Sequence, residues 1–250
     1  GAIIAQTPLV IAVETFGWRR TFIYMGIIMV IFAILTLLFV RDDPTEMGLP
    51  GMDEIENRPI ATSNINVMKA LGSILSNPKT WTISLVYIGL YTGYTVFLGT
   101  FGVSFLMSNY SITKIQAANY IIATVIGSAV SGLVIGYLSD KIKRRKSILI
   151  FSSIATLILW IVLIYVKLPL GLLTPYLFVF GFLMTAFTLC WTVGNEVNDR
   201  RLSGMSTGVV NCIGFLGAAV IPVIMGKVLD TYKNMPEIGY KKAYFVLIIL

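Results

Sequence analysis

The chain has 250 residues, of which 56% are hydrophobic and 12% charged, and its 19 Lys and Arg against 12 Asp and Glu give a formal net charge of +7. Soluble domains contain about 25% charged residues, so this composition excludes an ordinary soluble protein. The basic residues lie between apolar runs, and we interpret their excess as the loop bias of a membrane protein, which excludes nucleic-acid binding.

Long apolar runs follow one another along the chain, and each is close to the roughly 20 residues that a helix needs to cross a bilayer. The runs lack the alternation of barrel strands, so the sequence predicts an all-α integral membrane protein. Partial spans are expected at 1–13 and 241–250, and we expect a fragment cut inside a helix at both ends. The complete spans are expected at 20–40, 81–106, 115–138, 147–166, 173–193 and 206–226.

Residues 41–80 differ in character from the runs around them. They are rich in Asp, Glu and Pro, which predicts a polar linker and a domain boundary. Apolar residues at helical spacing between Val67 and Ser76 predict a short interfacial helix at the end of this linker.

Basic residues also set the expected orientation. The loops 41–80, 139–146 and 194–205 together hold more Lys and Arg than the loops on the opposite side, and the short 139–146 loop contributes most. Because short basic loops stay in the cytoplasm, we expect these three loops to be cytoplasmic, in a multi-pass protein of a bacterial plasma membrane.

Several residue types that carry catalysis or metal binding are scarce. The chain has no His, and its two cysteines, Cys190 and Cys212, lie inside apolar runs, where they are expected to pack as small side chains. No cluster of Cys or carboxylates marks a membrane face. We therefore expect no enzyme activity, no metal and no cofactor.

A short basic stretch carries the most specific motif. Residues 136–146 read Gly-Tyr-Leu-Ser-Asp-Lys-Ile-Lys-Arg-Arg-Lys and resemble the loop signature of the major facilitator superfamily, which runs Gly-x-Leu-small-Asp-basic-x-Gly-Arg-basic. Lys143 stands where the family usually has Gly. The matching residues are Gly136, Leu138, Ser139, Asp140, Lys141, Arg144 and Arg145.

The resemblance implies a bundle of two six-helix repeats, with the signature between the second and third helices of each repeat. Placing this copy in the second repeat makes 81–106 the seventh helix, so the chain would cover roughly helices 5 to 12. Residues 1–40 would then end the N-terminal bundle, 41–80 would link the bundles, and 81–250 would form the C-terminal bundle.

The resemblance also implies a gate near the loop signature. Asp140 would face the N-terminal end of the 206–226 helix, where free N–H groups favour an anion, and Glu196 and Arg200, four residues apart, would join this network. The alternative is a polar loop that only sets topology. The candidate gating residues are Gly136, Asp140, Lys141, Arg144, Arg145, Glu196 and Arg200.

Small residues at a spacing of four predict close helix contacts. Ser128, Gly132 and Gly136 follow this spacing, as do Gly204 and Gly208. Gly214 and Gly217, farther along the second of these helices, are expected to pack in the same way. We interpret these positions as packing surfaces and not as ligand contacts.

A polar and aromatic set is the candidate binding surface. Three tyrosines share one face of 81–106, further members lie on the 173–193 helix and its end, and an amide within an apolar run must face the interior or a wet cavity. The resemblance places the seventh and tenth helices around a central cavity; the alternative is interface belts or packed cores. The candidates are Tyr87, Tyr91, Tyr94, Thr188, Trp191, Asn195 and Asn211.

The expected function is transport of a small polar solute, an organic anion or a sugar acid, by alternating access coupled to H⁺ or Na⁺. We expect a monomer that contacts lipid. No Asp, Glu, Lys or Arg lies in the middle of a complete span, so a coupling residue would lie in the first four helices. The alternatives are a multidrug or metabolite exporter of the same fold and, from another class, a transport-inactive membrane sensor.

Overall fold

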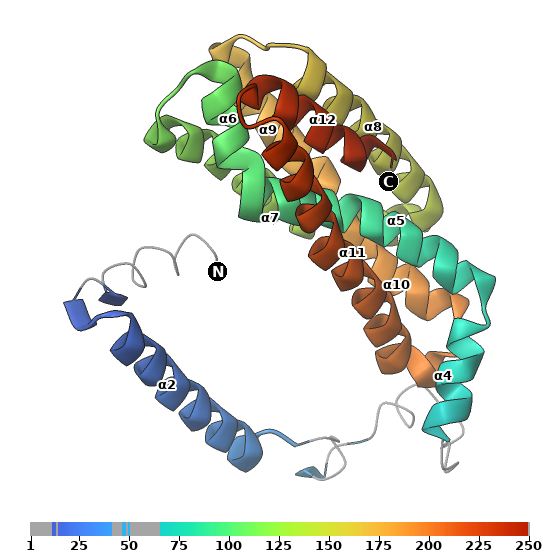
Figure 1. Ribbon diagram of the computed structural model, residues 1–250. Coiled ribbons are helices and arrows are strands. Elements are labelled where there is room, and N and C mark those ends of the chain that lie inside the picture. Colours follow the sequence, from blue (N-terminus) through green and yellow to red (C-terminus); the bar gives the residue numbers. More distant parts are fainter. Residues whose placement is uncertain (1–11, 14, 42–46, 49, 51–65, 250) are drawn as a thin grey trace. The chain divides into compact units, whose positions relative to one another are not determined.

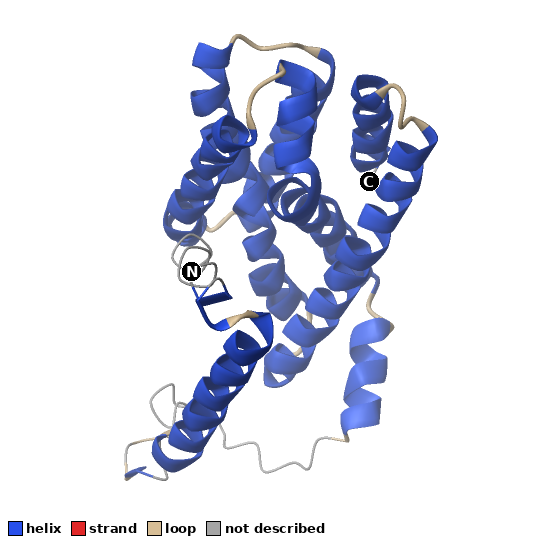
Figure 2. Cartoon of the chain, turned by 60° about the vertical axis from the view of Figure 1, so that its left-hand side comes forward, coloured by secondary structure: helices blue, strands red, loops and turns tan. Residues whose placement is uncertain are grey.

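The computed structural model describes residues 12–13, 15–41, 47–48, 50 and 66–249 (Figure 1). All regular elements in these ranges are helical and none is a strand (Figure 2), which confirms the all-α prediction. The chain divides into two units, 1–64 and 65–250, and the predicted finer division at 40 and 80 stays a prediction. Most of the expected span 1–13 and of the linker lies outside the described residues.

The first unit contains the spanning helix α2 (Trp18–Phe39), close to the predicted 20–40. Gly17 precedes the helix with φ 77°, a left-handed conformation that glycine adopts without the clash of a Cβ. The Thr21 hydroxyl donates to the Gly17 carbonyl at 3.0 Å and holds this first turn. With its 22 residues, α2 is long enough to cross the hydrocarbon layer.

The second unit opens with α4 (Val67–Leu75), the predicted short helix, whose N-terminus is capped by the Asn66 side chain. The chain then turns at Asn77, which caps α5 (Pro78–Thr95), and the fixed φ of Pro78 suits the first helical position. Beginning with α5, five membrane-spanning segments follow α4, and α12 (Pro236–Ile249) covers the predicted last partial span. The five segments are Pro78–Tyr110, Lys114–Ile142, Arg145–Tyr165, Leu170–Val197 and Arg200–Thr231.

Two of these segments are interrupted, whereas the sequence predicted regular helices. The first consists of α5, a π-helical turn (Val96–Phe101) and α6 (Gly102–Tyr110). The fourth consists of α9 (Leu170–Met184), a 3-10 turn (Thr185–Phe187) and α10 (Thr188–Val197).

The interruption of the fourth segment has a local cause. The Thr185 hydroxyl donates to the Gly181 carbonyl at 2.9 Å, and the Thr188 hydroxyl donates to the Thr185 carbonyl at 3.0 Å. Such bonds to the preceding turn compete with the backbone ladder and bend helices.

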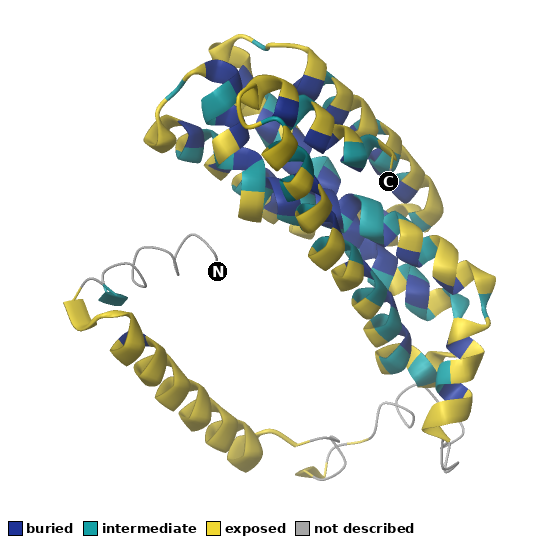
Figure 3. Ribbon diagram, in the orientation of Figure 1, coloured by how far each residue is buried: buried dark blue, intermediate teal, exposed yellow. Residues whose placement is uncertain are grey.

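The other three segments each contain one long α-helix. They are α7 (Lys114–Ile142), which begins with a capping box of Thr113 and Gln116, α8 (Arg145–Tyr165) and α11 (Ser203–Thr231). A 3-10 turn, Arg200–Leu202, precedes α11. Buried residues gather between these helices, and exposed ones cover their outer faces (Figure 3), including large apolar side chains such as Leu133, Phe151 and Val223. These outer faces suit lipid and not water.

Close helix crossings rest on four glycines. A Cβ at Gly127 of α7 would lie 2.0 Å from the Phe178 carbonyl oxygen of α9, and one at Gly181 would lie 2.0 Å from the Thr124 carbonyl oxygen. On α11, a Cβ at Gly214 would lie 1.8 Å from Tyr87 Cε1, and a Cβ at Gly217 would lie 2.7 Å from Ile88 Cγ2. Backbones therefore approach closely at both crossings, α7 on α9 and α5 on α11.

The predicted packing positions were only partly right. Gly214 and Gly217 pack as expected, and Ser128 is buried, with its hydroxyl 2.9 Å from the Thr124 carbonyl. In the described part of the chain, however, nothing lies within 4 Å of a Cβ built at Gly132, Gly136, Gly204 or Gly208. The spacing does not reveal which face of a helix meets a neighbour, and Gly127 and Gly181 were missed for the same reason.

Candidate functional site

An aromatic cluster lies where α5, α10 and α11 meet in the second unit. We use this name for Tyr87, Tyr91, Tyr94, Phe187, Trp191 and Phe215. The rings of Tyr87 and Tyr91 stack, with centroids 5.0 Å apart, and Phe187 meets Tyr91 edge-on at 5.1 Å. Phe187 also meets Tyr94 at 5.4 Å and Trp191 at 6.0 Å. Edge-to-face contacts at these distances are favourable and fix the ring positions.

One amide joins the cluster to α11. The Tyr87 hydroxyl donates to Asn211 Oδ1 at 2.8 Å, and the Trp191 indole N–H donates to the same oxygen at 2.9 Å. An indole N–H only donates, so the atom that faces it must be the amide oxygen. The orientation of Asn211 is therefore set by its partners, and its Nδ2 group, which makes no hydrogen bond within the described residues, keeps two N–H donors available.

The cluster contains both packed and accessible members. Tyr87 is fully buried against Gly214, as the core alternative for the tyrosines expects, so it serves to position Asn211. Tyr91, Trp191 and Asn211 are half-buried, so part of each side chain is accessible. A solute that reached these side chains would meet aromatic faces and amide N–H donors.

Two predicted binding residues lie outside this arrangement. The Thr188 hydroxyl is bound to its own helix at Thr185, and Asn195 Oδ1 accepts from the Thr207 hydroxyl at 3.0 Å, which ties α10 to α11. Two ring members, Phe187 and Phe215, were not expected from the sequence. Each stands four residues from a predicted one, Trp191 and Asn211, so helical spacing was the available signal.

An amide cluster, which the sequence did not reveal, joins the ends of three helices. Asn198 Oδ1 accepts from Asn77 Nδ2 at 3.0 Å, while Asn198 Nδ2 donates to the Gly194 carbonyl at 2.9 Å and to the Ser206 hydroxyl at 3.0 Å. Thr80 completes the set, because its hydroxyl donates to Asn198 Oδ1 at 3.3 Å. The start of α5, the end of α10 and the start of α11 are thus held together.

The linker between α10 and α11 is fixed by Asp199. Its carboxylate accepts from the backbone N–H of Arg201 at 3.0 Å, and the guanidinium of Arg201 lies 3.4 Å away. The backbone donor, with help from the guanidinium charge, lowers the pKa of Asp199. Among the described residues, no group of three or more His, Cys, Asp or Glu is placed to hold a metal ion.

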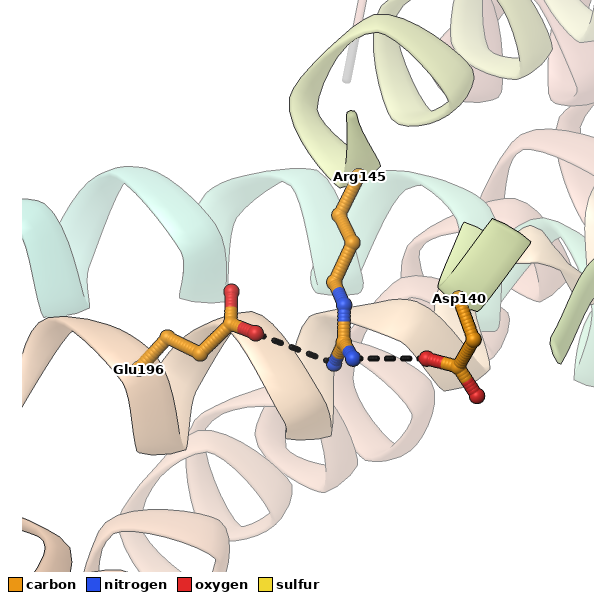
Figure 4. Close-up of polar contacts among 3 residues, drawn as sticks. All are labelled: Asp140, Arg145 and Glu196. Atoms are coloured by element: carbon orange, nitrogen blue, oxygen red, sulfur yellow. Dashed lines mark hydrogen bonds and ion pairs between the residues drawn. The ribbon is translucent and has the colours of Figure 1, made fainter. Parts of the chain in front are cut away.

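A charged triad, Asp140, Arg145 and Glu196, connects α7, α8 and α10 (Figure 4). Arg145 points from the start of α8 between the two carboxylates; its Nη2 lies 2.7 Å from Asp140 Oδ1 and its Nη1 lies 3.2 Å from Glu196 Oε1. The Arg145 side chain is 22% exposed, and those of Asp140 and Glu196 are 71% and 52% exposed. Ion pairs this open to solvent contribute about 1 kcal/mol or less each.

The partners of the two carboxylates differ from those expected. Asp140 was expected to face the start of α11 and Glu196 to pair with Arg200, but both carboxylates pair with Arg145. Arg200 is exposed in its 3-10 turn and makes no ion pair within the described residues. The i,i+4 expectation was wrong because Glu196 ends α10 and Arg200 lies beyond the break at Asn198, in a new turn.

The rest of the loop signature forms a tight turn. Lys143 has φ 54°, the left-handed conformation that explains the usual Gly at this position, and its backbone N–H donates to the Ser139 carbonyl at 3.0 Å. Lys141 lies 5.8 Å over the Tyr137 ring, and Arg144 is exposed immediately before α8. The substitution of Lys for Gly therefore preserves the turn.

Membrane-spanning helices around a polar, aromatic interior, with a charged turn between two of them, define a multi-pass membrane protein that holds polar groups inside its bundle. Residues 1–222 match the family model of the Major Facilitator Superfamily, so the chain belongs to that superfamily. This confirms the resemblance found in the sequence.

Three curated relatives show the breadth of the similarity. The chain is 26% identical over 257 residues to the membrane sensor protein UhpC of Escherichia coli, covering 93% of this chain and 55% of that protein. It is 22% identical to the probable galactarate/D-glucarate transporter GudP of E. coli (86% and 52% covered) and 24% identical to the cis,cis-muconate transport protein of Acinetobacter baylyi (90% and 54%). The chain spans about half the length of these relatives, and the bacterial ones indicate the plasma membrane.

Proposed function

We propose that the protein transports a small oxygen-rich solute, an organic anion or a sugar acid, by alternating access. The observation that carries this proposal is the orientation of Asn211, whose oxygen accepts from Tyr87 and Trp191 and whose Nδ2 makes no hydrogen bond to any described residue. Carboxylate and hydroxyl oxygens are the acceptors that such donors bind. The printed names of two relatives, a galactarate/D-glucarate transporter and a cis,cis-muconate transport protein, support the same class of solute.

The aromatic cluster supplies shape, and the amide supplies polarity. The described members of the cluster carry no formal charge, so the charge of an anionic solute would be balanced by groups outside the described residues. A coupled H⁺ or Na⁺ would act there as well. No cofactor is needed, because the work is differential binding of the solute by two conformations and not covalent chemistry.

The charged triad supplies a contact that is made in one conformation and broken in the other. We place it at the cytoplasmic face, in line with the basic character of its loop. Each ion pair contributes about 1 kcal/mol or less, so the bundle can release it during every cycle without a large barrier. The triad therefore biases the conformational equilibrium and does not lock it.

The test is uptake of D-glucarate and of cis,cis-muconate by the full-length protein in proteoliposomes. We expect saturable uptake of at least one of them and loss of that uptake in Asn211→Leu, which keeps an apolar side chain of similar size. Asn195→Leu is the matched control. Asn195 also lies between α10 and α11, but it contacts Thr207 and not the cluster. The proposal would be contradicted if the protein neither bound nor transported either probe, or if Asn211→Leu left the uptake unchanged.

A membrane sensor is the second candidate, because UhpC bears that name and matches 93% of this chain. A sensor would bind the solute in the same cluster without moving it. Saturable binding of a probe together with absent uptake, under conditions in which the protein is folded, would favour the sensor. Comparing the rate of uptake with the rate of efflux of the same probe would separate an importer from an exporter.

A further inference from the structure

A hollow of about 570 Å³ lies beside the turn between α7 and α8. We call it the basic hollow. Four cationic residues and two carboxylates line it, and both carboxylates belong to the charged triad, where they share Arg145. The other three cations, Lys143, Arg144 and Lys146, make no ion pair within the described residues. The hollow thus carries an excess of positive charge that no described residue balances.

One residue that lines this hollow has a buried hydroxyl without a partner among the described residues. Ser139 lines the hollow and is 1% exposed, and its Oγ makes no hydrogen bond within the described part of the chain. Buried polar groups are almost always paired, so an orphaned one needs an explanation. The rule that basic loops stay in the cytoplasm explains the cations but not this hydroxyl. A ligand with acceptor oxygens explains both.

The start of α8 also favours an anionic ligand. This 21-residue helix has no side-chain cap, and its first turn holds Arg145 and Lys146 where acidic residues are favoured. Free backbone N–H groups and cations at one place attract an anion. Lys143 adds to this charge from a left-handed position at which glycine would be less strained.

We propose that the basic hollow binds the phosphate of an anionic phospholipid headgroup. The hollow lies where α7 ends and α8 begins, and a bilayer crossed by both helices would place its headgroups there. The same two helices carry exposed apolar residues within a few positions of the lining, Tyr137 and Ile142 on α7 and Ile150 on α8, and these would contact the acyl chains. Lys143, Arg144 and Lys146 pair with the phosphate, and Ser139 donates its hydroxyl to a phosphate oxygen. This site is separate from the aromatic cluster and does not rest on the solute.

The experiment uses the delipidated full-length protein in detergent, with phosphatidylglycerol or phosphatidylcholine added. Retained lipid is measured by native mass spectrometry, and the unfolding midpoint is measured in parallel. The wild type is expected to retain phosphatidylglycerol in preference to phosphatidylcholine and to be stabilised by it. Lys143→Gly is expected to bind phosphatidylglycerol about fivefold more weakly, the factor for one cation near a membrane surface.

The lipid-free midpoint separates binding from folding. Lys143→Gly relieves the left-handed residue, so its lipid-free midpoint should equal or exceed that of the wild type while the stabilisation by phosphatidylglycerol shrinks. Ser139→Ala should also weaken binding without lowering that midpoint, because its hydroxyl has no partner to lose. Lys167→Gln, in the turn at the other end of α8, is the control and should bind like the wild type.

Three outcomes would overturn the proposal. The first is equal retention of phosphatidylglycerol and phosphatidylcholine by the wild type. The second is wild-type binding of phosphatidylglycerol by both Lys143→Gly and Ser139→Ala. The third is full stabilisation by millimolar inorganic phosphate, with the same sensitivity to these variants, which would assign the hollow to a free anion and not to a lipid.

Discussion

Replacing Gly214 by Ala tests how the aromatic cluster is built. The new Cβ would lie 1.8 Å from Tyr87 Cε1, so the ring or the helix must move by roughly 1.5 to 2 Å to reach an ordinary contact distance. Overpacking of this kind costs about 1–3 kcal/mol, and loss of the bond between Tyr87 and Asn211 adds about 1 kcal/mol. The better helix propensity of Ala offsets about 1 kcal/mol. We expect a net destabilisation of about 1–3 kcal/mol.

The control lies on the same helix. Nothing within 4 Å meets a Cβ at Gly208, so Gly208→Ala keeps the propensity gain without the clash. Unfolding of both full-length variants in one detergent, followed by tryptophan fluorescence, should place the midpoint of Gly214→Ala several degrees below that of Gly208→Ala. A midpoint for Gly214→Ala at or above that of Gly208→Ala would refute the close approach of α11 to Tyr87.

Three further predictions concern the cluster, the triad and the other crossing. Trp191→Phe removes one of the two donors that orient Asn211, so the KM for the transported probe should rise about fivefold while the unfolding midpoint changes little; an unchanged KM would contradict that role. Asp140→Asn should alter the uptake rate but leave membrane insertion intact, as judged by the amount of folded protein in the membrane fraction, and unaltered uptake would count against a gating role. Gly127→Ala places a Cβ 2.0 Å from a backbone carbonyl and should destabilise the protein by about 2 kcal/mol or more, whereas Gly132→Ala on the same helix should not; equal midpoints would exclude the α7–α9 crossing.

The pairing of Arg145 with two carboxylates bears on how the charged triad responds to mutation. One guanidinium serves both Asp140 and Glu196, so loss of Arg145 frees both carboxylates at once. Residues that share a partner are energetically coupled. The effects of substituting the two carboxylates should therefore be non-additive when the substitutions are combined.

The order of helices along the chain followed from the sequence by itself. A bilayer demands about 20 apolar residues for each crossing and tolerates no unpaired backbone, so composition alone located the helix around 20–40 and the five spans after it. The loop signature also marked position 143 as the usual place of a glycine, and the structure has there the left-handed turn that glycine suits. These features depend on local chemistry and on the solvent, and neither requires knowledge of a neighbouring helix.

The contacts between helices were decided by the tertiary structure. Asn211 meets Trp191 across 20 residues and Tyr87 across 124, and helical spacing says nothing about such distant partners. Gly127 packs while Gly132 does not, although both belong to one helix with small residues on several faces. Which face of each helix turns inward depends on how the helices rotate and cross. That choice is fixed by the fit of all the helices together, and no single segment contains it.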